Sequence, residues 1–321
     1  MTILNSKYNA PGFLKSGHVQ TIYSSMFRKI DIPNYVRERI ETVEEDFLDL
    51  DWSKIGSGKL VIISHGLEGN TNRPYVTGMV RELNNSGFDV LAWNFRSCSG
   101  EINKVLRFYH SGSSDDLETV IEHVNKDYNY NTISLVGFSM GGNVTLKYLG
   151  ENIRNKISNA VVISVPCDLK SSSEELSRKR NWIYMKRFLL KLKKKLLAKK
   201  ELYPNKISLE GFNKIKNFKT YDDIYTAPIH GFKNAEDYWA KCSSINLISD
   251  IQIPTLIINA LDDPFLSGSC YPFNETEESE AVFLETPKHG GHVGFVDFNN
   301  AGSFWSERRA VEFLNNSMRV K

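Results

Sequence analysis

The pattern with the clearest chemical meaning in this sequence is a serine between two glycines. Residues 137–141 read Gly-Phe-Ser-Met-Gly, directly after an apolar run and directly before a stretch with helical character. A sharp turn from strand to helix lifts a serine hydroxyl above the sheet, and flanking glycines permit the close backbone packing that this turn needs. The positive end of the following helix would stabilise an oxyanion that forms nearby. We therefore predict that Ser139 is a nucleophile; the alternative is an ordinary glycine-rich turn.

A serine nucleophile needs a general base, and the base needs an acid that fixes its tautomer. Late in the chain, residues 261–265 read Leu-Asp-Asp-Pro-Phe and residues 289–295 read His-Gly-Gly-His-Val-Gly-Phe, each after an apolar run. The order serine, acid, histidine suits a nucleophile on a strand-to-helix turn. His292 is the predicted base, and either Asp262 or Asp263 could be the acid. His289 and His292 could instead bind a metal, but the sequence offers no evident third ligand, so no metal site is predicted.

The oxyanion of an attacked carbonyl needs hydrogen-bond donors. Residues 65–69 read His-Gly-Leu-Glu-Gly and follow the apolar run at 60–63. A loop in this position supplies one backbone N–H, and the residue after the nucleophile supplies the other. The predicted donors are the amides of Leu67 and Met140, and the imidazole of His65 is predicted to be structural.

These residues follow short apolar runs that the sequence predicts to be strands of one sheet. The runs are bounded by turn residues and alternate with helical stretches in the first half of the chain; they cover residues 60–64, 89–94, 132–136, 160–165, 254–260 and 281–285. Continuous apolar runs are typical of parallel strands that helices cover on both faces. We predict an α/β fold with a mostly parallel, doubly wound sheet. One helix is predicted to begin at Ser113, with Asp116 completing a capping box.

Residues 166–244 interrupt this alternation, because they contain no convincing strand and are too long for a simple loop. We predict a helical cap insertion at 166–244, with the core formed by residues 1–165 and 245–321. The cap includes an apolar stripe at helical spacing, with lysines predicted on the opposite face: Trp182, Met185, Leu189, Leu192 and Leu196.

Composition limits the remaining function classes. The 321 residues are 41% hydrophobic and 24% charged with a net charge of +2, which disfavours disorder and nucleic-acid binding. There is no run of about 20 apolar residues for a membrane span and no apolar N-terminal secretory segment. The four scattered cysteines indicate reduced thiols and a cytoplasmic protein. The basic run at 178–200 is expected to be a solvated face, with weak contact to an anionic membrane surface as the alternative.

Beyond these single motifs, the chain resembles the YheT-like family of the α/β-hydrolase superfamily, which includes EMB-type plant proteins, yeast medium-chain ethyl ester synthases and animal abhydrolase-domain lipases. The similarity extends over nearly the whole chain. Besides the motifs given above, it includes residues 17–22 (Gly-His-Val-Gln-Thr-Ile), 94–96 (Asn-Phe-Arg), 109–112 (Tyr-His-Ser-Gly) with Asp116, 137–143, 231–232, 237–238, 259–264 and 290–295.

The resemblance implies an α/β-hydrolase fold with Ser139 as nucleophile, Asp263 as acid and His292 as base. It also implies hydrolysis or transfer of small or lipid-like acyl esters without a metal or organic cofactor. The chain departs from the family after Arg96, where relatives have a glycine closer to the arginine than Gly100. Residues 17–22 have no mechanism that we can derive and are expected to pack against the sheet edge. Residues 109–112 are interpreted in the same way, although their position could place them near the pocket.

The leading hypothesis is therefore a serine carboxylic-ester hydrolase that forms an acyl-enzyme. Two alternatives are an acyltransferase that uses an alcohol acceptor and a catalytically silent ligand-binding homologue. The expected partner is a small-molecule acyl ester, with no nucleic acid and no obligate protein partner.

Overall fold

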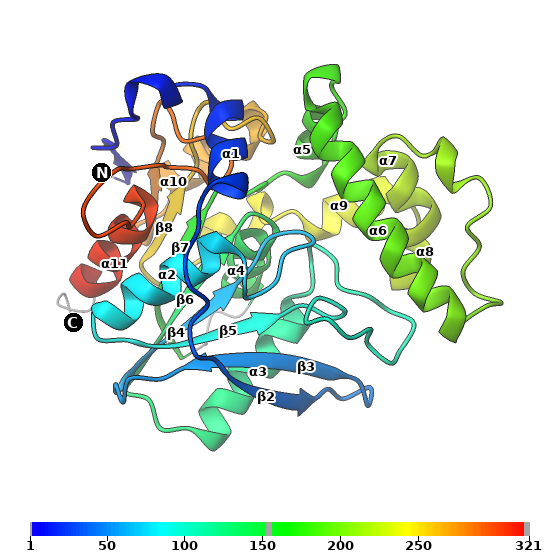
Figure 1. The fold of residues 1–321 in the computed structure, drawn as a ribbon, viewed down its shortest axis with the longest axis horizontal. Helices are drawn as coiled ribbons and strands as arrows, with labels where there is room; N and C mark the ends of the chain where they lie inside the picture. The colour runs from blue at the N-terminus through cyan, green and yellow to red at the C-terminus, as the bar shows by residue number, and fades with distance from the viewer. Residues whose placement is uncertain (1, 152–155, 318–321) are drawn as a thin grey trace.

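A nine-stranded sheet runs through the computed structural model, which describes residues 2–151 and 156–317 (Figure 1). The strand order is β1-β9-β8-β7-β6-β4-β5-β3-β2, and all neighbours are parallel except the pairs that β3 makes with β2 and β5. The strands are β1 (Ile3–Leu4), β2 (Val36–Glu41), β3 (Phe47–Ser53), β4 (Lys59–Ser64), β5 (Asp89–Asn94), β6 (Thr132–Phe138), β7 (Ile157–Ile163), β8 (Thr255–Ile258) and β9 (Val282–Glu285).

The prediction of a mostly parallel α/β sheet is confirmed, and each of the six predicted runs contains a strand. The run predicted at 160–165 begins earlier, at Ile157, and ends at Ile163. Three strands were not predicted: β1, β2 and β3. Residues 48–52 of β3 alternate apolar and acidic side chains, and this period-2 signal could have revealed the strand.

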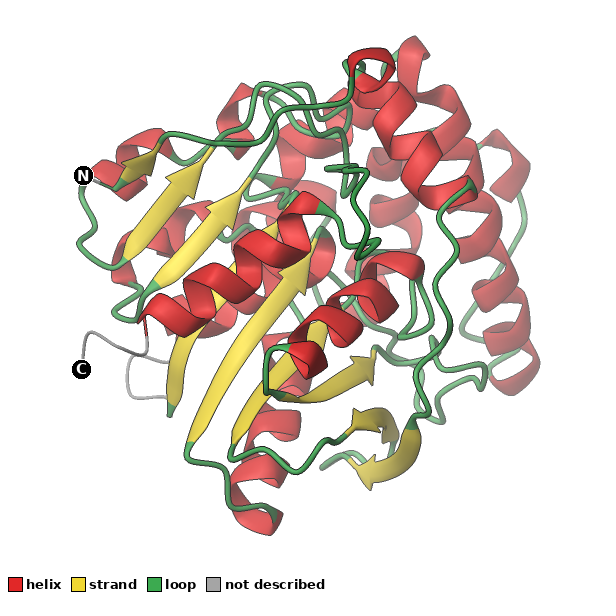
Figure 2. Cartoon of the chain, turned by 60° about the vertical axis from the view of Figure 1, so that its left-hand side comes forward, coloured by secondary structure: helices red, strands yellow, loops and turns green. Residues whose placement is uncertain are grey.

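Helices cover both faces of the sheet, as Figures 1 and 2 show. Side chains alternate along each strand. Leu60 and Ile62 of β4 therefore pack with α3 (Ser114–Asp127) and α4 (Met140–Glu151), whereas Val61 and Ile63 pack with α2 (Pro74–Asn85) and α11 (Trp305–Ser317). This two-sided burial explains why the central strands are continuously apolar. The core helices are α1 (Gly17–Met26), α2 (Pro74–Asn85), α3 (Ser114–Asp127), α4 (Met140–Glu151), α10 (Phe273–Glu277) and α11 (Trp305–Ser317).

The segment between β7 and β8 that was predicted as a cap, residues 166–244, contains helices and no strand. Its helices form a lobe at the side toward which the parallel strands point (Figures 1 and 2). They are α5 (Leu169–Leu176), α6 (Trp182–Leu202), α7 (Phe218–Tyr221), α8 (Ala227–His230) and α9 (Ala235–Cys242). Shorter helical turns along the chain are η1 (Gly12–Leu14), η2 (Lys179–Asn181), η3 (Phe212–Lys214), η4 (Asp222–Thr226), η5 (Ile245–Asp250) and η6 (Gly268–Cys270). Within the described ranges, no helix is both long enough and apolar enough to cross a membrane.

The pattern predicted for α6 is only partly correct. Four members of the apolar stripe are buried, namely Met185, Leu189, Leu192 and Leu196, but Trp182 is 59% exposed. The lysines do not all face solvent either. Lys199 is fully buried and donates to the carbonyl oxygens of Asn103 and Val105, and Lys195 pairs with Glu68. Long lysine stems lie along apolar surface while the ammonium reaches acceptors on the core loops, so α6 is basic on more than one face.

The start of α3 also differs in its details. The helix begins at Ser114, with Ser113 at the N-cap position as predicted. The capping box is wrong, however, because the Ser113 hydroxyl oxygen accepts from the amide of His110 and Asp116 pairs with Arg96. The carboxylate of Asp116, which the local pattern assigned to the start of the helix, thus pairs with the buried guanidinium of Arg96 instead.

A buried charge network around Arg96 holds the loop after β5. Its guanidinium lies 2.6 Å from Asp116 and 3.0 Å from Asp46, and all three side chains are almost completely buried. Asp46 also accepts from the side-chain amide of Asn103 and the backbone of Lys104, so the network joins the β2–β3 hairpin, this loop and α3. Removing one partner of such a network leaves uncompensated charge in a low-dielectric interior.

The substitution Arg96→Met is therefore expected to destabilise the fold by about 3–5 kcal/mol, because it strands Asp46 and Asp116. Urea denaturation followed by circular dichroism measures this loss. The control is Lys170→Met, which removes an exposed pair with Glu236 and should have no measurable effect. Equal midpoints for the two variants would contradict the structural role of the network.

Candidate active site

Ser139 lies in a sharp turn between β6 and α4, as the sequence predicts. Its φ of 52° is in the left-handed region that side chains other than glycine seldom adopt, which is typical of strained functional positions. A Cβ on Gly141 would lie 2.4 Å from the carbonyl oxygens of Ser64 and His65, so this position requires glycine. Gly141 is therefore explained by contact between the turn and the end of β4, whereas a Cβ on Gly137 would collide with Gly142 and Thr145 at the start of α4.

Ser139, His292 and Asp263 come together in one hydrogen-bonded row. The distance from Ser139 Oγ to His292 Nε2 is 2.9 Å, and His292 Nδ1 lies 2.9 Å from Asp263 Oδ2. An ionised carboxylate only accepts, so Nδ1 carries the proton and Nε2 is left to accept from the serine hydroxyl. The side chain of Asp263 is fully buried, and its Oδ1 also accepts from the amide of Phe265, which fixes the carboxylate.

The two aspartates that the sequence left as alternatives face different histidines. Asp262 Oδ1 accepts from the amide of Gly291, and its Oδ2 lies 3.3 Å from His289 Nδ1. Burial raises the pKa of Asp262 above its ordinary value. Asp262 thus stabilises the loop after β9 that carries His289 and His292, called the histidine loop below, while Asp263 contacts the ring of His292. In the part of the chain that the structure describes, no group of three His, Cys, Asp or Glu residues is arranged to hold a metal ion.

The loop after β4 brings Leu67 to the same cavity as Ser139, Met140 and His292. Met140 is the first residue of α4, where the helix offers no acceptor for its amide. His65 orders this loop: its Nε2 accepts from the amide of Phe95, so its Nδ1–H donates to the carbonyl of Gly66 at 2.8 Å. Burial lowers the pKa of His65 to about 3, which keeps the ring neutral. Leu67 and Met140 thus both line the cavity at Ser139, and their role as oxyanion donors stays a prediction.

Residues 17–22 support the histidine loop rather than only the sheet edge. The amide of His292 donates to Thr21 Oγ1 at 2.8 Å, and the amide of Val296 donates to Gln20 Oε1 at 3.0 Å. A Cβ on Gly17 would lie 1.8 Å from the carbonyl oxygen of Asp262, so the start of α1 must be glycine to pack here. Only the family resemblance pointed to these residues, since no local pattern reveals a contact about 270 positions away.

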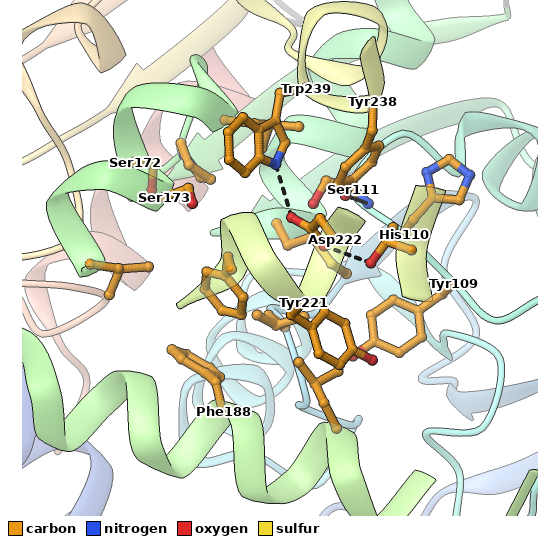
Figure 3. A pocket seen from close by; sticks show the side chains of 18 of the residues that line it. Tyr109, His110, Ser111, Ser172, Ser173, Phe188, Tyr221, Asp222, Tyr238 and Trp239 are labelled. Atoms are coloured by element: carbon orange, nitrogen blue, oxygen red, sulfur yellow. Dashed lines mark hydrogen bonds between the residues drawn. The ribbon is translucent and has the colours of Figure 1, made fainter. Parts of the chain in front are cut away.

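Two cavities meet at Ser139 and His292. The inner cavity, of about 130 Å³, lies under α6 and reaches α7, η4 and α9; the outer cavity, of about 410 Å³, lies between α1, α6 and the loop after β4. The inner one is mainly apolar and aromatic, and Figure 3 shows several of its side chains, including Tyr109, Phe188, Tyr221, Tyr238 and Trp239. Residues 109–111 belong to this wall, as the alternative prediction that they lie near the pocket expects.

One acidic side chain, that of Asp222, lines the inner cavity. Asp222 accepts from the indole N–H of Trp239 at 2.9 Å (Figure 3). It also accepts from the hydroxyl of Thr226 at 2.6 Å. Burial raises its pKa to about 7, so much of this group is uncharged at neutral pH. Apart from Lys195, which pairs with Glu68, the wall therefore presents little fixed charge to whatever occupies the cavity.

Comparisons with known proteins agree with this geometry. Residues 59–298 match the family model described as the alpha/beta hydrolase fold. YheT of Escherichia coli K12 is 31% identical over 95% of this chain and 92% of its own length. Phospholipase ABHD3 of Bos taurus is 26% identical over 87% of this chain and 70% of its own length. Monoacylglycerol lipase of Saccharomyces cerevisiae is 28% identical over 79% of this chain and 58% of its own length.

Among solved structures, the esterase Pf2001 of Pyrococcus furiosus superposes with a TM-score of 0.62 at 19% identity, covering 89% of this chain and 91% of its own. At that identity the likeness concerns the fold alone. The family model and the extended similarity to YheT go further. The chain belongs to the α/β-hydrolase family and, within it, to the YheT-like group.

Proposed function

We propose that this protein is a carboxylic-ester hydrolase that forms an acyl-enzyme on Ser139. The observation that carries the proposal is the row of two 2.9 Å contacts that joins Ser139 to His292 and His292 to Asp263. The names of three similar proteins, "Putative esterase YheT", "Phospholipase ABHD3" and the yeast "Monoacylglycerol lipase", support ester hydrolysis as the reaction type.

In the proposed reaction, His292 Nε2 takes the hydroxyl proton while Ser139 Oγ attacks the ester carbonyl carbon. The amides of Leu67 and Met140 donate to the resulting oxyanion. The protonated His292 then gives its proton to the leaving alkoxide oxygen, and the carbon–oxygen bond breaks to leave an acyl-enzyme. A water molecule, deprotonated by His292, attacks this ester and releases the carboxylic acid and Ser139. Asp263 stabilises the imidazolium throughout and holds the required tautomer.

The inner cavity is the proposed site of the acyl chain, because its wall is apolar and it begins at the nucleophile. Hydrocarbon is favoured there, since about 0.8 kcal/mol is gained for each methylene removed from water. The outer cavity is left for the alcohol part of the ester.

The acyl-enzyme can also transfer its acyl group to an alcohol, and this alternative stays a prediction. Both reactions use the same residues, so hydrolysis with added ethanol, followed by analysis for ethyl esters, distinguishes them. A silent binding homologue, in contrast, would not need the aligned row of serine, histidine and aspartate.

Replacement of the nucleophile is the direct test of the mechanism. Ser139→Ala should abolish hydrolysis of p-nitrophenyl butyrate and labelling by a fluorophosphonate probe, while the melting temperature stays close to that of the wild type. The serine side chain is small, so little packing is lost. Labelling that persists in Ser139→Ala would place the nucleophile elsewhere.

The two aspartates should differ strongly in their effect on activity. Asp263→Asn is expected to lower kcat by about 10⁴-fold, because an amide next to His292 Nδ1 favours the wrong tautomer. Asp262→Asn keeps an acceptor for the amide of Gly291 and should cost much less. Steady-state kinetics on the same ester compares them, and a reversed order would refute the assignment of Asp263.

Filling the inner cavity should shorten the accepted acyl chain. Leu192 lines this cavity from α6, so Leu192→Trp should lower kcat/KM for long p-nitrophenyl esters far more than for the acetate. The matched control is Leu197→Trp on the same helix, where the side chain is 47% exposed. Retained hydrolysis of the acetate shows that the variant is folded. An equal loss of kcat/KM for all esters from acetate to palmitate would mean that the acyl chain binds elsewhere.

A further inference from the structure

The outer cavity contains three cations that have no carboxylate partner among the described residues. Each makes its hydrogen bond to an uncharged oxygen: Arg73 and Lys191 donate to the carbonyl of Glu68 at 3.2 and 2.9 Å, and Arg187 donates to the hydroxyl of Ser25 at 3.3 Å. All three line the cavity together with Ser139 and His292. The mouth of the site is therefore positively charged.

The nearby carboxylate of Glu68 does not neutralise these three cations, because it is paired elsewhere. Glu68 Oε1 lies 2.9 Å from Lys195 Nζ and accepts from the hydroxyl of Tyr109 at 2.6 Å. A further cation of the same cavity, Arg28, forms an ion pair with Glu307. The positive charge of Arg73, Arg187 and Lys191 is thus an excess that the fold leaves open to the cavity.

The protonation of Lys191 responds to this excess. Its pKa is lowered to about 8, first by partial burial and then by the charges of Arg73 and Arg187, with Glu68 acting in the opposite direction. At neutral pH the group is mainly charged, next to two other cations and partly shielded from water. An anion in the cavity would relieve this repulsion.

Helix α6 contributes different side chains to the two cavities. Leu192 and Lys195 line the inner cavity but not the outer one, and Phe188 lines both. Arg187 and Lys191 line the outer cavity, one turn apart on the helix. One helix therefore gives the nucleophile an apolar neighbour on one side and cationic neighbours on the other.

We propose that the outer cavity binds an anionic group, a phosphate or carboxylate, on the alcohol part of the ester substrate. The guanidinium groups of Arg73 and Arg187 suit the paired oxygens of such a group, and Lys191 adds a point charge. The substrate class is then an ester that joins an apolar acyl chain to an anionic alcohol. This inference rests on the proposed ester hydrolysis and deepens it.

The test compares two substrates that differ by one phosphate group, 1-octanoyl-glycerol and 1-octanoyl-glycerol 3-phosphate, below their micelle concentrations. The wild type should show a higher kcat/KM for the phosphate ester, and the preference should weaken in 1 M salt, where the Debye length is only about 3 Å. The octanoyl ester of glyceric acid shows whether a carboxylate serves equally well. Equal kcat/KM for the neutral and both charged esters would overturn the proposal.

Variants locate the preference. Arg187→Gln and Lys191→Gln should each lower the ratio of charged to neutral kcat/KM by about tenfold, as expected for loss of a charged hydrogen bond. Lys191 also donates to the carbonyl oxygen of Glu68 in the loop after β4, so a variant could disturb that loop. A change in kcat/KM for the neutral ester measures this separate effect. The controls are Lys194→Gln and Lys200→Gln, whose side chains on α6 are exposed, and they should leave the ratio unchanged. An equal drop of the ratio in the controls would also refute the site.

A binding measurement separates this inference from the proposed function. Calorimetry with Ser139→Ala should show tighter binding of the phosphate ester than of the neutral ester, and adding Arg187→Gln should remove the difference. Charge-dependent binding without any turnover in the wild type would refute ester hydrolysis and retain the anion site. Turnover with charge-independent binding would retain hydrolysis and refute the anion site.

Discussion

The active site depends on one hydrogen bond, between Ser139 Oγ and His292 Nε2, because it joins chain segments that are 153 residues apart. The serine is fixed by the turn after β6, and the histidine is fixed by the loop after β9. Both strands are parallel members of one sheet and end at the same edge, so their loops meet there. The alignment therefore relies on the register of the sheet as much as on the two side chains.

The histidine loop needs support because it lies beyond the last residue of β9 and has no ladder of its own. Asp263 holds the ring, Asp262 holds the amide of Gly291, and Thr21 holds the amide of His292. These contacts satisfy polar groups that would otherwise be costly in a largely buried loop. The N-terminal helix α1 is thus part of the active-site framework although it supplies no reacting group.

Helix α6 links the segment at 166–244 to the loop that carries Leu67. Lys195 pairs with Glu68, and Lys191 donates to the carbonyl of the same residue, directly after Leu67 in the chain. Movement of α6 would therefore shift the loop that carries the proposed oxyanion donor, the amide of Leu67. The contact of this helix with an anionic membrane surface stays a prediction, and Lys195 cannot contribute to it because its ammonium is buried against Glu68.

The sequence by itself determined the features that depend on local pattern: the apolar parallel strands, the turn at Ser139 and the order of nucleophile, acid and base. Apolar runs and glycine spacing are properties of neighbouring residues, so they can be recognised without a structure. The local pattern left open which aspartate faces His292; the family resemblance implied Asp263, and the structure has this contact. Only the tertiary structure decided that Lys195 and Lys199 turn inward and that Asp116 pairs with Arg96 instead of capping α3. These outcomes depend on partners far away in the chain. A charged side chain takes whichever partner best compensates its burial, and the local sequence does not contain that partner.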